Sequence, residues 1–293
     1  MALEIASGTV RPGKTFAHQF ANNIAAYVVG IRSFNLSYGT GTDHWIRTAS
    51  ISLSPSASGQ QLSVNVDATL VDSSGNSMNV DDSYIELVAL AWTGTADSQL
   101  LFTNVDGVPN GSSSQSYPIP GTTTLIDTAA LAGFDLSYGN SDHQILHIAA
   151  RAGVSTSSSS VAVTSAASMY DGHGNNVSTA TVDGGLIVNC DSSLNIQAIT
   201  LPNLQNASSD TRISFGANYN SFLLLLTGFQ VQFNGSTDHN VRSFGAGLIL
   251  GNTGQGYAEV NGSAWMQDNS GNHQNDGASY ASGIIIGYTS TIS

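Results

Sequence analysis

The sequence predicts an all-β protein made of three tandem antiparallel β-sandwich modules of about six strands each, in a pseudo-threefold arrangement. Three observations lead to this prediction. A set of landmarks recurs three times along the 293 residues, apolar residues alternate with a period of two, and turns rich in Gly, Asn and Ser separate short apolar runs. No segment shows the 3.6-residue periodicity of an amphipathic helix.

The first landmark is a strand-like segment in which an aromatic, a branched aliphatic and a second aromatic residue occupy every second position. Its three copies are Phe34-Asn-Leu36-Ser-Tyr38, Phe134-Asp-Leu136-Ser-Tyr138 and Phe229-Gln-Val231-Gln-Phe233. Alternate residues of a strand point to the same face of the sheet. Each copy should therefore turn one aromatic face toward a core.

Two further landmarks follow in fixed order. An Asp-His pair comes first, at Asp43-His44, Asp142-His143 and Asp238-His239. An Asp-x-x-Gly-Asn element comes next, at Asp72-Ser-Ser-Gly75-Asn76, Asp171-Gly-His-Gly174-Asn175 and Asp268-Asn-Ser-Gly271-Asn272. The two aspartates are 29, 29 and 30 residues apart, so the order does not arise by chance.

The Asp-x-x-Gly-Asn element is typical of a hairpin turn, in which Asp accepts backbone N–H bonds and Gly adopts a positive φ. A calcium-binding loop would need the Asp-x-Asp-x-Asn-Gly spacing that supplies enough oxygen ligands. The sequence therefore predicts a turn and no metal site.

The period of nearly 100 residues predicts three units, at 1–97, 98–195 and 196–293, because a repeat of this length can bury a core of its own. The joining segments Leu100–Gly121 and Leu194–Arg212 mix turn residues with apolar ones. We interpret them as ordered arms that begin the next copy. Similar modules with matching surfaces tend to close into a symmetric ring.

Strand positions follow from the apolar pattern. Leu62, Val64, Val66, Ala68 and Leu70 alternate with polar residues, which is typical of a half-buried strand. The runs that end the copies, Ile85–Trp92, Leu186–Cys190 and Ile284–Ile286, are short and apolar. We expect these runs to be central strands of a sheet.

Composition excludes several classes of partner. Charged residues are 9% of the chain, the formal net charge is −13 and the pI is near 4.5. Nucleic acids and anionic membranes need clustered Lys and Arg, so neither is expected as a partner.

The first residues lack the pattern of a Sec signal peptide, and no apolar run reaches the ~20 residues of a membrane-spanning helix. The compartment is not indicated, since Cys190 is the one cysteine and a single cysteine forms no intrachain disulfide.

The Asp-His pairs are the candidate functional residues, with two interpretations. His44 shares a strand phase with Ile46, so its imidazole should face the apolar side while Asp43 faces outward. In the structural interpretation, which we favour, the histidine is hydrogen-bonded at the sandwich edge or between copies. In the functional interpretation, the aspartates accept sugar hydroxyls and a nearby indole stacks on the sugar.

Indoles and guanidinium groups complete the candidate site. Trp45, Trp92 and Trp265 are the candidate platforms, although each is individually more typical of packing. Arg47 and Arg242 follow an Asp by four positions on the same strand face, so a surface ion pair is the simplest expectation for both. The predicted ligand-binding residues are Asp43, His44, Trp45, Arg47, Trp92, Asp142, His143, Asp238, His239 and Arg242.

Catalytic motifs are not found in the sequence. It contains no Gly-x-Ser-x-Gly elbow, no His-Glu-x-x-His and no phosphate-binding loop, and three glutamates leave little scope for paired carboxylate chemistry. Adjacent Asp and His on a strand face opposite ways and cannot act on each other, although a catalytic set from distant positions stays open. We expect no enzyme and no cofactor.

The first copy resembles the H-type lectin domain. The resemblance rests on Phe16-Ala-His-Gln-Phe20 before Tyr27-Val-Val-Gly-Ile31, and on the closing Tyr84-Ile-Glu-Leu-Val-Ala-Leu-Ala-Trp92. It implies a six-stranded antiparallel sandwich that assembles as a trimer and binds N-acetylgalactosamine-type sugars. Copies two and three end in Asn189-Cys190 and Gly287-Tyr288 instead of Ala-Trp, and the ligand residues of the family have no secure counterpart here.

Two functions are therefore considered. The first is a non-enzymatic lectin-like carbohydrate-binding protein with repeated shallow polar sites, whose partners are glycans. The alternative is a structural or assembly subunit of a fibre, shell or injection apparatus, or a toxin component, which contacts another protein surface through its β-sandwiches. A homo-oligomer is compatible with either function.

Overall fold

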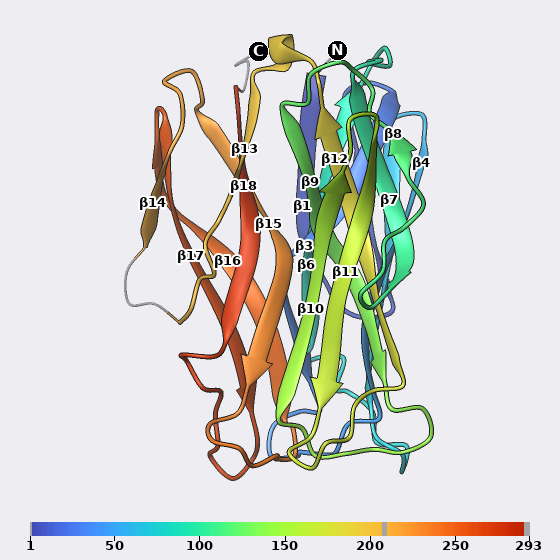
Figure 1. Cartoon of the computed structure of the whole chain (residues 1–293), viewed down its shortest axis with the longest axis vertical. Helices are drawn as coiled ribbons and strands as arrows, with labels where there is room; N and C mark the ends of the chain where they lie inside the picture. Colours follow the sequence, from blue (N-terminus) through green and yellow to red (C-terminus); the bar gives the residue numbers. More distant parts are fainter. Residues whose placement is uncertain (1, 207–209, 290–293) are drawn as a thin grey trace.

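The structure is a computed structural model that describes residues 2–206 and 210–289. In this part of the chain it contains eighteen strands, a single 3₁₀ turn at Ser192–Leu194 and no α-helix (Figure 1). The predicted all-β fold class is confirmed. None of the described elements is a helix with the length and apolar character needed to cross a membrane.

The strands form three antiparallel sheets of six strands each. Sheet I has the order β1 (Ala2–Val10), β6 (Tyr84–Thr93), β3 (Ile24–Ser37), β16 (Ser243–Gly254), β17 (Tyr257–Gln267), β14 (Thr211–Ser214). Sheet II has the order β13 (Ile196–Thr200), β18 (Tyr280–Tyr288), β15 (Ser221–Gln232), β10 (His147–Thr156), β11 (Ser160–Tyr170), β8 (Tyr117–Pro118). Sheet III has the order β2 (Lys14–Gln19), β5 (Gln61–Val71), β4 (Thr48–Ser58), β9 (Ile126–Ser137), β12 (Thr179–Asn189), β7 (Leu100–Pro109).

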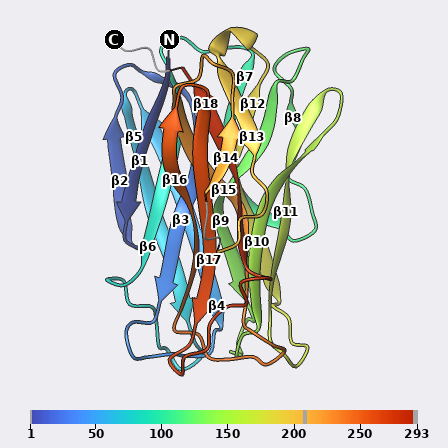
Figure 2. The ribbon, with the colours of Figure 1, turned by 90° about the vertical axis from the view of Figure 1, so that its left-hand side faces the viewer.

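Every sheet is shared between two copies of the repeat. Strands of the first and third copies meet at β3–β16, those of the first and second at β4–β9, and those of the second and third at β10–β15. Each copy gives three strands to one sheet and three to the next, and its two halves pack face to face. The three modules are thus arranged with pseudo-threefold symmetry. Most of their strands run lengthwise along the molecule (Figures 1 and 2).

Equivalent residues of the three copies meet in the core. The rings of Phe34, Phe134 and Phe229, the first positions of the aromatic landmark, lie with centroids 5.0 to 5.7 Å apart, and all three are buried. The copies also approach closely at Gly30. A Cβ atom there would lie 2.7 Å from the Ala130 Cβ and 2.9 Å from Leu225 Cδ2, so a residue without a side chain is required.

The strand predictions hold in detail. Leu62, Val64, Val66 and Leu70 are buried along β5. The apolar runs that end the copies form β6, β12 and β18, each hydrogen-bonded on both sides. The expected arms contain β7 and β8, and then β13 and the start of β14. Residues 207–209 of the second arm lie outside the described residues.

Candidate functional site in the Asp-His ring

The three Asp-His segments meet where β3, β9 and β15 end. Each segment pairs through its backbone with the two others, by isolated antiparallel bridges. The bridges are His44 to Val241, Ile46 to His143 and Ile145 to His239, with N···O distances of 2.8 to 3.1 Å. We call residues 43–47, 142–146 and 238–242 the Asp-His ring.

The Asp-x-x-Gly-Asn elements are turns, as predicted. In the first turn Asp72 Oδ1 accepts the Ser74 N–H at 2.9 Å and the Asn76 N–H at 2.8 Å, and Gly75 has a φ of +91°. The other two turns repeat this geometry around Asp171 and Asp268. Burial pushes the pKa of Asp72 upward, but the hydrogen bonds from Asn76 and Ser74 outweigh burial and hold this pKa below its ordinary value.

Each histidine of the ring lies between the turn and the aromatic landmark of its own copy. His44 Nδ1 is 3.4 Å from Asp72 Oδ2, and its ring centroid is 4.8 Å from that of Tyr38. His143 and His239 contact their turn aspartates at 3.2 and 3.7 Å and also lie against an aromatic ring. The imidazoles are half-buried, which agrees with the structural interpretation of these histidines.

Each aspartate of the ring reaches the turn of a neighbouring copy. Asp43 Oδ2 accepts the Asn269 N–H at 2.9 Å, and Asp142 Oδ2 accepts the Ser73 N–H at 3.0 Å. At the third junction Asp238 Oδ2 instead contacts His173 Nδ1, at 3.0 Å. The aspartates thus hold the copies together, which the sequence alone did not indicate.

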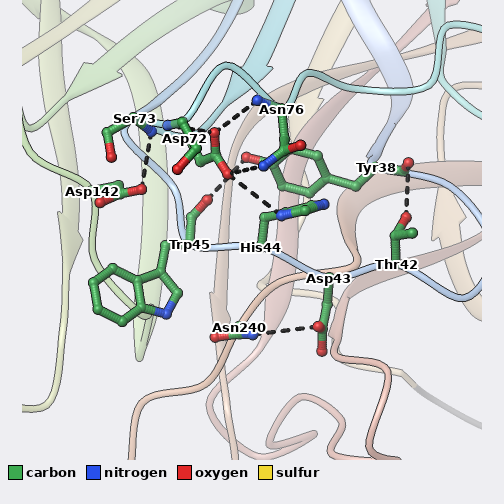
Figure 3. A network of polar contacts seen from close by, with 11 residues as sticks. Tyr38, Thr42, Asp43, His44, Trp45, Asp72, Ser73, Asn76, Asp142 and Asn240 are labelled. Atoms are coloured by element: carbon green, nitrogen blue, oxygen red, sulfur yellow. Dashed lines mark hydrogen bonds and ion pairs between the residues drawn. The ribbon is translucent and has the colours of Figure 1, made fainter.

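A polar hollow of about 340 Å³ opens beside Trp45. Its lining consists of Asp43, His44, Trp45, Asp72, Ser73, Ser74, Asn76, Asp142 and Asn240. The Trp45 side chain extends away from the hydrogen-bonded cluster in Figure 3, and the residue is 47% exposed. Asp142 uses Oδ2 to bind Ser73, and within the described part of the chain its Oδ1 has no hydrogen bond. We call this hollow the Trp45 pocket.

Not all predicted site residues reach the Trp45 pocket. Asp238, His239, Arg242, His143 and Arg47 belong to the ring but do not line the pocket. Trp92 is far from it, because it lies at the other end of β6, where it pairs with Leu3. Trp92 is 5% exposed and donates its Nε1–H to the Thr95 carbonyl at 3.0 Å. Trp92, predicted as a ligand-binding residue, therefore lies apart from the Asp-His ring and lines a separate hollow with Leu3 and Glu4.

The surface ion pairs expected for the two arginines are not formed. Neither Arg47 nor Arg242 lies within 4.0 Å of a carboxylate among the residues that the structure describes. Their carbonyl groups accept the N–H groups of Tyr138 and Tyr38, both at 2.9 Å, so their backbone helps to close the ring.

Trp265 is a packing residue. Its indole covers Gly245, where a Cβ would come within 2.4 Å of the ring, and its Nε1–H binds Asn35 Oδ1 at 2.9 Å.

A second hollow, of about 350 Å³, lies on sheet II and was missed by sequence reasoning. His147 and Arg151 of β10 line it. Burial lowers the pKa of His147 to about 4, and the neighbouring Gln232 side chain partly opposes this shift. A comparison of the copies could have found His147 and Arg151. The equivalent positions of strand β4 hold Thr48 and Ser52, so the imidazole and the guanidinium group are not shared with the first copy.

A larger hollow, of about 630 Å³, lies between β3, β4 and β7. Its lining contains no histidine or tryptophan and a single carboxylate, that of Asp106. This hollow has fewer charged and aromatic side chains that could bind a ligand than the Trp45 pocket has. We therefore place the candidate site at Trp45.

One group of side chains in the described region has the composition of a metal site. The potential ligand atoms of Asp171, His173 and Asp238 lie within 4.8 Å of one another.

Comparisons with known proteins add no further constraint. No protein-family model matches the chain, and neither a curated protein nor a solved structure matches it.

Proposed function

We propose that the protein is a non-enzymatic, lectin-like carbohydrate-binding protein that holds a sugar in the Trp45 pocket. The observation that carries the proposal is the indole of Trp45, 47% exposed, at the rim of a hollow lined by carboxylate, amide and hydroxyl groups. Burying an indole normally stabilises a fold, so an indole left exposed beside converging polar groups favours a binding role.

The indole and the polar side chains of the Trp45 pocket match the apolar face and the hydroxyl groups of a sugar. The apolar face of a pyranose stacks on an aromatic ring, while its paired hydroxyls donate to carboxylates. In the pocket the Asp142 Oδ1 makes no hydrogen bond in the described structure, and the side chains of Ser73 and Ser74 are exposed. The Asp72 carboxylate already accepts hydrogen bonds from Ser74 and Asn76 and lies 3.4 Å from His44 Nδ1, so we assign it to positioning the turn.

A single shallow pocket implies weak binding. In the two other copies the residue after the Asp-His pair is Gln144 or Asn240, and neither offers an aromatic face. One sugar site per chain is therefore proposed, and useful avidity would need several chains or a multivalent glycan. We also propose, from the resemblance of the first copy, that the modules are H-type lectin-like.

The decisive test compares two single variants on a glycan array. Trp45→Gln places in the first copy the residue that the second copy has, so the variant should fold. We expect it to lose at least about tenfold in affinity, equivalent to ~1.4 kcal/mol. Leu125→Gln, which removes an exposed apolar side chain elsewhere, serves as the control and should bind like the parent protein.

Two results would overturn the proposal. One is the absence of any glycan signal from folded parent protein at high concentration. The other is unchanged binding by Trp45→Gln.

A structural or assembly role is the second candidate. Each of the three sheets ends on two strands that are bonded on one side within the described structure, and such edges can pair between chains. Light scattering separates the two candidates, because edge pairing predicts growth of particle mass with concentration, whereas the lectin proposal predicts a discrete low-order species.

A further inference from the structure

We infer that the third junction of the Asp-His ring is a binding site for one divalent transition-metal ion, such as Zn²⁺, ligated by His173, Asp238 and Asp171. These residues come from the turn of the second copy and the ring segment of the third. This inference is independent of the proposed sugar binding.

The third junction differs from the other two. At the other two junctions a backbone N–H, from Ser73 or Asn269, donates a hydrogen bond to the carboxylate of the ring aspartate. The equivalent residue at the third junction is Gly172, where a Cβ would lie 2.8 Å from the Ser236 carbonyl oxygen. Within the described chain, the His173 imidazole is the one hydrogen-bond partner of Asp238.

The donor set suits a transition metal. One potential ligand atom from each of His173, Asp238 and Asp171 lies within 4.8 Å of the other two, close to the span around an ion with bonds of ~2.0–2.2 Å. His173 Nδ1 is 3.0 Å from Asp238 Oδ2. An imidazole nitrogen with two carboxylates favours Zn²⁺ and its neighbours over Ca²⁺ and Mg²⁺, which prefer oxygen ligands alone. With three protein ligands, water would complete the coordination.

Charge and burial favour a cation at this point. Asp171 and Asp238 are 5% and 7% exposed, and in the described structure neither pairs with a lysine or arginine. Buried carboxylates are costly unless a positive charge offsets them. The His173 side chain is 73% exposed, so an ion can enter from solvent.

Binding requires one local change. The Asp171 Oδ1 accepts the N–H groups of His173 and Asn175, while its Oδ2 contacts the Asn175 amide and, at 3.2 Å, His143 Nδ1. An ion on Oδ2 would replace the His143 contact, and the two backbone bonds that shape the turn would stay. His173 would bind through Nδ1 in the neutral tautomer that carries its proton on Nε2.

The chain supplies matched variants. The positions equivalent to His173 are Ser74 and Ser270, so His173→Ser makes the second turn like the other two and should fold. Asp238→Asn removes a ligand charge from the other side of the junction. His273→Ser is the control, because His273 is an exposed histidine of the third turn that does not belong to the cluster.

The experiment is titration of the chelator-treated full chain with Zn²⁺ by calorimetry, with Co²⁺ absorption to report the ligand field. We expect one ion per chain and a tetrahedral Co²⁺ spectrum for the parent and for His273→Ser. His173→Ser and Asp238→Asn should bind at least about a hundredfold more weakly, since even indirect metal partners contribute about 10- to 100-fold. The absence of Zn²⁺ uptake by folded parent protein, or affinity unchanged in both variants, would overturn the inference.

Discussion

At the scale of single residues, one hydroxyl distinguishes otherwise equivalent positions beside the ring histidines. Tyr38 donates its hydroxyl to the Trp45 carbonyl at 3.0 Å. The hydroxyl of Tyr138 is buried and has no hydrogen-bond partner among the residues that the structure describes, and the third copy has Phe233 at this place. A buried polar group without a partner costs about 1–3 kcal/mol, whereas a made bond contributes about 1 kcal/mol.

The two tyrosines should therefore respond oppositely to the same substitution. Tyr138→Phe is expected to leave the free energy of unfolding unchanged or to raise it by about 1 kcal/mol, while Tyr38→Phe should lower it by a similar amount. Urea denaturation of the two variants measures both changes. Equal destabilisation by the two substitutions would contradict the different bonding of the two hydroxyls.

Individual roles were the part least accessible from the sequence. The sequence indicated that Asp43, Asp142 and Asp238 are equivalent, but not that they reach across to turns of neighbouring copies. Trp45 and Trp92 were both predicted to bind ligand, although one is exposed and the other buried. Exposure depends on neighbours that are distant in the chain, which local patterns do not encode.

At the scale of elements, the three Asp-x-x-Gly-Asn turns connect stability to pH. Burial raises the pKa of Asp72, Asp171 and Asp268, but bonds from the turn Asn and N–H groups outweigh burial, so each pKa is lowered. A carboxyl whose folded pKa lies below its unfolded value of ~3.9 stabilises the fold above pH ~3.9. This stabilisation disappears as the pH falls through the folded pKa.

The triple variant Asp72→Asn, Asp171→Asn, Asp268→Asn tests this linkage. Its free energy of unfolding at pH 7 should fall by several kcal/mol, since hydrogen bonds to a charged group contribute about 1.5–3 kcal/mol each. Its remaining stability should also change less than that of the parent between pH 5 and pH 2. Asp67→Asn, on the exposed side of β5, is the control. Parallel stability curves for parent and triple variant would rule out the turns as the acid-sensitive elements.

Strands and turns were largely predictable because their signals are local. The alternation along β5 and the glycine positions of the turns need only neighbouring residues to be recognised. The pairing of β3 with β16 joins residues about 200 positions apart, such as Phe34 and Ala246. No local pattern specifies such a pairing, so the sharing of each sheet between copies was not foreseen.

At the scale of the whole molecule, the shared sheets couple the copies. Removing one copy would leave two sheets with half their strands and would expose the contact among Phe34, Phe134 and Phe229. We therefore expect the full chain to unfold in one cooperative transition. Calorimetry should give equal calorimetric and van't Hoff enthalpies. Three resolved transitions, one for each unit of about 100 residues, would contradict this coupling.

The covalent linking of the copies has an evolutionary consequence. In a ring of three separate identical chains, any substitution would appear at every junction, and a harmful one would do its damage threefold. Because the junctions here are encoded separately, an indole could arise at one and an imidazole at another while the remaining contacts were kept. A single gene can thus place different recognition chemistries around a common scaffold.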